Sequence, residues 1–163
     1  MKTISNETGL TLNQSKTGRL LRVALPGALA GGILLIVYFL GVRAIGYHEN
    51  TYLRWLNFVL IIPVSLFTIN RYLKSGTGKT YLEALASSIF ACLGSYSFLS
   101  LFTFVYLHID VAFMEMLYQK AFPELDLSPL SIVILLVFEG AVGSTIISFV
   151  LMQFYKDQMR NAA

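Results

Sequence analysis

The stretch VALPGALAGGILLIVYFLGV, residues 23–42, contains twenty consecutive residues without a formal charge. An α-helix rises about 1.5 Å per residue, so a helix of this length crosses the roughly 30 Å hydrocarbon core of a bilayer. Three further apolar stretches follow, at about residues 53–69, 81–107 and 129–155. The sequence therefore predicts four transmembrane helices.

The composition supports the same conclusion. Of the 163 residues, 56% are hydrophobic and only 13% are charged, whereas soluble domains contain about 25% charged residues. So few charged side chains do not cover the surface of a compact soluble fold. This excludes an ordinary soluble enzyme, a disordered chain and a nucleic-acid-binding module. We expect one all-α integral membrane domain, a bundle of four transmembrane helices.

The predicted organisation is a transmembrane domain over residues 19–156, between a flexible cytoplasmic tail at residues 1–18 and a cytoplasmic tail at residues 157–163. Between the third and fourth spans, apolar residues recur at helical spacing within the acidic segment 109–128. This pattern predicts a short amphipathic helix at the membrane interface that stops at Pro123, with an irregular loop as the alternative.

Two patterns predict where helices begin. Ser128 followed by Pro129 is typical of an N-cap and a first helical position. Thr80 and Glu83 have the spacing of a capping box, in which a hydroxyl and a carboxylate bind backbone amides at a helix start. We therefore expect a structural role for Glu83.

The basic residues predict the orientation. Nine of them flank the span ends on one side of the membrane and three lie on the other. The positive-inside rule therefore places both termini in the cytoplasm, and an even number of spans requires both to lie on one side. The nine are Lys2, Lys16, Arg19, Arg22, Arg71, Lys74, Lys79, Lys156 and Arg160, and the three are Arg43, Arg54 and Lys120.

Glu139 is the one formal charge deep inside a predicted span. If hydrocarbon covers about residues 132–152, its carboxyl lies roughly 4 to 5 Å from the bilayer midplane by helical rise. An ionised carboxylate is costly there, so we expect Glu139 to be neutral and hydrogen-bonded inside the bundle. Polar side chains at similar predicted depth are its candidate partners: Tyr38, Asn57, Tyr96, Ser97 and Ser100.

Small residues predict where helices pack closely. Gly27 and Gly31 form a small-xxx-small pattern in the first span, and Gly140, Gly143 and Ser144 form a second such surface in the fourth. These surfaces let another helix approach, although glycines also scatter through membrane helices without that role. In the third span, small residues at three- and four-residue intervals are expected to face the bundle interior: Ala84, Ser87, Ser88, Ala91, Cys92 and Ser95.

One loop segment is similar to a phosphate-binding motif. SGTGKT, residues 75–80, resembles one, but Leu73 stands where the motif requires its first glycine. A membrane helix precedes it in place of a buried strand, so we expect no nucleotide binding. Cys92 is the single cysteine, which excludes an internal disulfide.

Metal and catalytic patterns are likewise not predicted. His48 and Glu49 lie on the same predicted side as His108 and Asp110, and these are usual metal ligands. Their spacing does not require a metal site, and loop histidines are mostly solvated. No catalytic triad or glycine elbow occurs in the spans, so we expect no enzyme activity, no metal and no cofactor.

Two stretches combine features of a known family. INRYLKSGTGKTYLEAL, residues 69–85, places a basic turn before an aromatic and small-residue helix, and FEGAVGSTIISFVLMQFYK, residues 138–156, combines a mid-span acid, a glycine four residues on and a basic end. With the acidic segment before residue 128, they resemble the small four-span bacterial membrane proteins of the family named domain of unknown function 4199. The resemblance covers about residues 20–156 and implies a four-span fold and a location in the bacterial inner (plasma) membrane, not an activity.

These observations predict a small non-enzymatic multi-pass membrane protein. Besides the lipid bilayer, its expected partners are further copies of itself or a larger membrane complex in which it is an accessory subunit, and not nucleic acid. The alternative is a small transporter or a proton or ion pathway in which Glu139 titrates.

Overall fold

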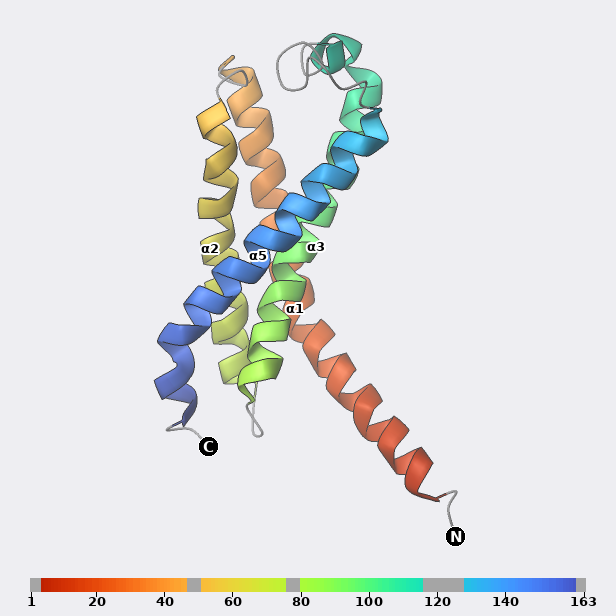
Figure 1. The fold of residues 1–163 in the computed structure, drawn as a ribbon, viewed down its shortest axis with the longest axis vertical. Coiled ribbons are helices and arrows are strands. Elements are labelled where there is room, and N and C mark those ends of the chain that lie inside the picture. Colours follow the sequence, from red (N-terminus) through yellow and green to blue (C-terminus); the bar gives the residue numbers. More distant parts are fainter. Residues whose placement is uncertain (1–3, 47–50, 76–79, 116–127, 161–163) are drawn as a thin grey trace.

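The computed structural model describes residues 4–46, 51–75, 80–115 and 128–160. These residues are helical apart from short turns, and no strand occurs among them (Figure 1). Four helices are long and apolar enough to cross a membrane, which confirms the predicted all-α class. They are α1 (Ile4–Ala44), α2 (Thr51–Lys74), α3 (Tyr81–Ile109) and α5 (Pro129–Arg160).

The helix ends differ from the predicted spans mainly in α1 and α5. The flexible tail predicted for residues 1–18 is helical from Ile4, and α5 continues to Arg160. No proline interrupts either extension, so each can continue from a long helix that is already formed, at little nucleation cost. Residues 161–163 lie outside the described residues.

The helix α3 lies at the centre of the bundle and packs against α1, α2 and α5. Its contacts with α1 run from Arg19 and Glu83 at one end to Arg43 and Asp110 at the other, so these two helices are parallel. Figure 1 shows α5 crossing the other helices obliquely, with both chain ends at the same end of the bundle.

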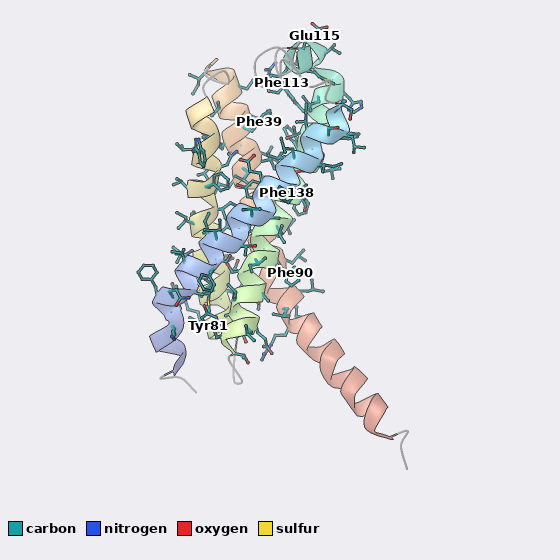
Figure 2. The ribbon with its side chains drawn as sticks, viewed as in Figure 1. Phe39, Tyr81, Phe90, Phe113, Glu115 and Phe138 are labelled. Carbon is teal, nitrogen blue, oxygen red and sulfur yellow. The ribbon has the colours of Figure 1, made fainter. Side chains whose placement is uncertain are left out.

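Small residues allow the helices to pack closely where they cross. A Cβ atom at Gly27 would lie 2.3 Å from Thr68 Oγ1, and one at Gly31 would lie 2.2 Å from Ser95 Oγ. The six small residues predicted to line the inner face of α3 are all buried, which confirms that prediction. Large side chains such as Phe90 and Leu101 cover the outer face of α3, as lipid contact requires (Figure 2).

Both predicted helix starts are confirmed, because Thr80 is the N-cap residue of α3 and Ser128 precedes α5, but the Thr80 hydroxyl does not make the predicted capping hydrogen bond. The backbone N–H of Ser131 donates to Ser128 Oγ at 3.2 Å, so Ser128 is the N-cap of α5. The Thr80 side chain makes no capping hydrogen bond. Its backbone N–H donates instead to the Tyr72 hydroxyl at 3.2 Å, because that hydroxyl reaches the start of α3 from α2.

The predicted interfacial helix is described only at its beginning. Residues 111–115 are helical, and the backbone N–H of Phe113 donates to Asp110 Oδ1 at 3.0 Å, as at an N-cap. Residues 116–127, including the predicted stop at Pro123, lie outside the described residues.

Candidate functional site: a polar seam between two arginine clusters

An arginine cluster ties three helices together at the start of α3. We call it the Arg19 cluster: Arg19 of α1, Tyr72 of α2 and Glu83 of α3. The Arg19 guanidinium donates to Glu83 Oε2, which also accepts from the Tyr72 hydroxyl at 2.8 Å. The guanidinium lies 5.7 Å from the centre of the Tyr72 ring, within the range of a cation–π contact. One carboxylate oxygen therefore connects α1, α2 and α3.

A second cluster, the Arg43 cluster, occupies the other end of α1 and α3. Arg43 donates to Asp110 Oδ2, which also accepts from the Tyr106 hydroxyl at 3.1 Å. The guanidinium lies 4.3 Å from the centre of the Phe113 ring and 5.3 Å from that of Tyr106. Phe39 of α1 meets Phe113 edge to face, with ring centres 5.9 Å apart (Figure 2). The cluster fixes the start of the helix after α3 against α1.

The environment of Asp110 favours its ionised form. The hydrogen bond from the Phe113 backbone N–H lowers the pKa of Asp110 below its ordinary value of 3.8, against partial desolvation, and the Tyr106 hydroxyl and the Arg43 guanidinium lower it further. In the unfolded chain the carboxyl titrates at its ordinary pKa. The stabilisation is therefore fully present above the ordinary value and is lost as the pH falls through the lowered pKa of the folded state.

We predict a pH-dependent difference in stability between the wild type and Asp110→Asn. At pH 6 the wild type is expected to be the more stable, because it retains the ionised pair with Arg43. As the pH is lowered below about 4, the difference should shrink, since Asp110 becomes neutral. Unfolding in mixed detergent micelles, followed by circular dichroism from pH 6 to pH 3, measures it. A difference that stays constant over this range would contradict the prediction.

Between the two clusters lies a line of buried hydroxyl and thiol groups, which we call the polar seam. Its members come from three helices and are all buried in the bundle: Ser65 and Thr68 of α2, Ser87, Ser88, Cys92, Ser95, Ser100 and Thr103 of α3, and Ser144 and Ser148 of α5.

Serine hydroxyls join three helices within the seam. Ser88 Oγ lies 2.5 Å from Ser65 Oγ and 2.8 Å from Ser148 Oγ. The Cys92 thiol interacts with the same Ser88 and Ser148 side chains. Ser95 donates to the Ala28 and Ala91 carbonyls, at 3.2 and 3.0 Å. Hydrogen bonds between side chains of membrane helices average about 0.6 kcal/mol, so this part of the seam stabilises the bundle modestly.

Two members of the seam differ from the rest. The hydroxyls of Ser100 and Ser144 are buried and have no hydrogen-bond partner among the described residues. A buried polar atom in this state is costly unless a water or another group binds it. These two positions, one on α3 and one on α5, are where the seam could hold a small polar molecule.

Glu139 is half-buried on α5 and lies beside the seam. Its neighbour Gly140 is buried, and a Cβ atom there would lie 2.3 Å from Tyr96 Cγ. Ile146 and Val150, which follow Glu139 at helical spacing, are 58% and 50% exposed. Glu139 therefore lies at the boundary between the packed face of α5 and its exposed apolar face.

The predicted partners of Glu139 are spread over three helices. Tyr96 is buried against Gly140, the residue next to Glu139. Ser100 is buried within the seam, whereas Ser97 is exposed and donates to the Leu93 carbonyl at 3.0 Å. Asn57 of α2 and Tyr38 of α1 are half-buried.

The predicted packing residues all lie at helix crossings. A Cβ atom at Gly143 would lie 2.1 Å from Phe58 Cε1, where α5 meets α2, and Ser144 is buried in the seam. Gly27, Gly31 and Gly140 lie at the contacts with Thr68, Ser95 and Tyr96 described above.

The possible metal ligands are only partly described. No group of three or more His, Cys, Asp and Glu side chains comes together in the described part of the chain. His48 and Glu49 lie outside it. His108 is exposed, and its Nδ1 lies 2.8 Å from the Phe104 carbonyl oxygen.

Sequence reasoning missed both arginine clusters. The paired residues are 64 positions apart in the Arg19 cluster and 67 in the Arg43 cluster, so no local pattern joins them. The available signal was an arginine near each end of the first apolar span and an acid near each end of the third.

The described residues form a helical bundle in which four helices are each long and apolar enough to cross a membrane. Comparisons with protein-family models, with curated proteins and with solved structures find no match.

Proposed function

We propose that this chain is a non-enzymatic multi-pass protein of the bacterial inner membrane that associates with a second copy of itself through α5. The observation that carries the proposal is the position of Glu139 at the edge of an exposed apolar face. The distribution of basic residues supports an orientation with both termini in the cytoplasm. The resemblance to the family named domain of unknown function 4199 supports the location.

The physical argument is that the face of α5 beside Glu139 is exposed and apolar. Ionisable side chains in a membrane almost always face protein, a cavity or another polar group. In α5 only 17% of the span is buried, against 33% to 44% in the other three helices. A second copy of α5 would cover the half-buried Glu139, and a protonated carboxyl could donate a hydrogen bond across the contact.

Cysteine cross-linking in membranes tests this contact. Cys92 is fully buried, so a single exposed cysteine can be introduced without replacing it. We expect Ile146→Cys to form disulfide-linked dimers. Leu25→Cys is the matched control: Leu25 is 55% exposed against 58% for Ile146, and it lies on α1 instead of α5. Equal cross-linking at the two positions would contradict the proposal.

The contribution of Glu139 to dimerisation is measured by the same cross-linking, in the Ile146→Cys variant. Glu139→Leu removes the hydrogen bond, which is worth about 0.6 to 1.7 kcal/mol, and should lower the dimer association constant about threefold to fifteenfold. Glu139→Gln retains a donor and should have a smaller effect. Unchanged dimerisation in Glu139→Leu would show that Glu139 does not take part in the contact between copies. A reproducible stoichiometric partner other than a second copy would favour an accessory-subunit role.

The buried hydroxyls of Ser100 and Ser144 support a second candidate function, a proton or ion pathway that uses Glu139. Polar atoms of this kind can line the route of a small solute between helices. Reconstitution in liposomes distinguishes the two functions. A pH-dependent flux that Glu139→Gln abolishes, with dimerisation unchanged, would favour the pathway.

A further inference from the structure

The carboxyl ends of α2 and α5 lie side by side at the same end of the bundle as both chain termini. The Tyr155 hydroxyl of α5 donates to Asn70 Oδ1 of α2 at 3.2 Å. This contact places the next residue of each helix, Arg71 and Lys156, at the same level on neighbouring helices. Both side chains are exposed, and so is Lys74, one turn further along α2.

Two cations at one level repel each other unless an anion lies between them. The nearest described carboxylate at this end, Glu83, is bound by Arg19 and Tyr72. Among the described side chains, Arg71, Lys74 and Lys156 therefore give the end of the α2 and α5 pair a positive charge.

The surroundings of these cations match an amphipathic ligand better than a soluble anion. Along each helix, a large exposed apolar side chain precedes the cation on the side of the bundle's middle. Phe67 of α2 is 48% exposed and Phe154 of α5 is 75% exposed. Asn70 accepts through its oxygen, so its amide NH₂ group remains a hydrogen-bond donor. Cations and an amide at the end of an exposed apolar surface are the chemistry that a phospholipid phosphate and its acyl chains require.

We infer that Arg71 and Lys156, with Asn70, bind the phosphate of an anionic phospholipid between the carboxyl ends of α2 and α5. The phosphate bridges the two cations and offsets their repulsion. The acyl chains follow the exposed surface at Phe67 and Phe154. The site lies within a single chain.

Native mass spectrometry of the detergent-solubilised protein, titrated with phosphatidylglycerol or phosphatidylcholine, tests the site. We expect the first phosphatidylglycerol to bind more tightly than phosphatidylcholine. In Arg71→Gln/Lys156→Gln its affinity should fall about 25-fold, since each cation near a lipid surface contributes roughly a factor of five. Arg71→Lys/Lys156→Arg keeps both charges and should retain binding.

A second double variant controls for total charge. Lys16→Gln/Arg22→Gln removes two cations from α1 and should leave the first binding event unchanged. An equal loss of affinity in both double variants would overturn the site, as would equal binding of the two lipids by the wild type. Displacement of the lipid by glycerol phosphate at equal concentration would show a soluble-phosphate site and overturn the lipid assignment. Circular dichroism confirms that each variant is folded.

Discussion

Replacing Gly140 with alanine is expected to lower the free energy of unfolding by about 2 to 3 kcal/mol. The added Cβ atom would lie 2.3 Å from Tyr96 Cγ and 2.7 Å from Tyr96 Cβ. Both atoms belong to the base of the side chain, so rotating the ring does not relieve the overlap. Tyr96 is 1% exposed and packs in a core cluster with Leu35 and Ile61, so α5 has to move away from α3.

Gly41→Ala is the matched control for this prediction. Gly41 is a glycine within α1, and a Cβ atom there meets nothing within 4 Å. Alanine has the higher helix propensity, so this variant should unfold no more easily than the wild type. Both free energies can be measured by unfolding in mixed detergent micelles. Equal stability of the two variants would show that α3 and α5 do not pack as closely at Gly140 as described.

Glu83→Ala is expected to lower the free energy of unfolding by about 1.5 to 3 kcal/mol, the usual value of a hydrogen bond to a charged group. The change removes the acceptor shared by Arg19 and Tyr72, so both donors lose a partner. It also removes a connection between the start of α3 and α1, which are far apart in the sequence. The Glu83 side chain is only 18% exposed, so water replaces the lost contacts incompletely.

Comparison with Arg19→Ala and with the double variant isolates the ion pair. If Arg19 and Glu83 interact directly, the double variant should be more stable than the sum of the two single losses predicts. Glu115→Ala is the control. Glu115 is exposed in the helical segment 111–115, so its replacement should change the free energy of unfolding by less than about 0.5 kcal/mol. Additive losses for Arg19 and Glu83 would contradict the pairing.

The spans could be predicted from the sequence because hydropathy and length are local properties. A run such as residues 23–42 has one stable environment, whatever the rest of the chain does. The inner face of α3 could also be predicted, since small residues at three- and four-residue intervals share one face of any helix. The N-cap at Ser128 depends on contacts within three residues, and it was found for the same reason.

The pairing of charges could not be predicted, because it depends on which helices become neighbours. Glu83 has the spacing of a capping residue, yet in the bundle it accepts from Arg19 and Tyr72. A charged donor gives a stronger hydrogen bond than a backbone amide, so the tertiary partner prevails over the local pattern. The surroundings of Glu139 also depend on packing, since the rotation of α5 against α3 decides which of its residues are covered.

The two arginine clusters also bear on the bilayer that this protein prefers. Arg19 and Arg43 lie about 36 Å apart along α1 by helical rise, and each is held by an acid on α3. Between the two paired arginines, the uncharged residues 23–42 span about 30 Å by helical rise, which matches an ordinary hydrocarbon core. A thinner bilayer has to thicken locally or the helices have to tilt, at a cost of fractions of a kcal/mol per Å of mismatch. We therefore expect a membrane of uneven thickness to concentrate the protein where the hydrocarbon core is close to this length.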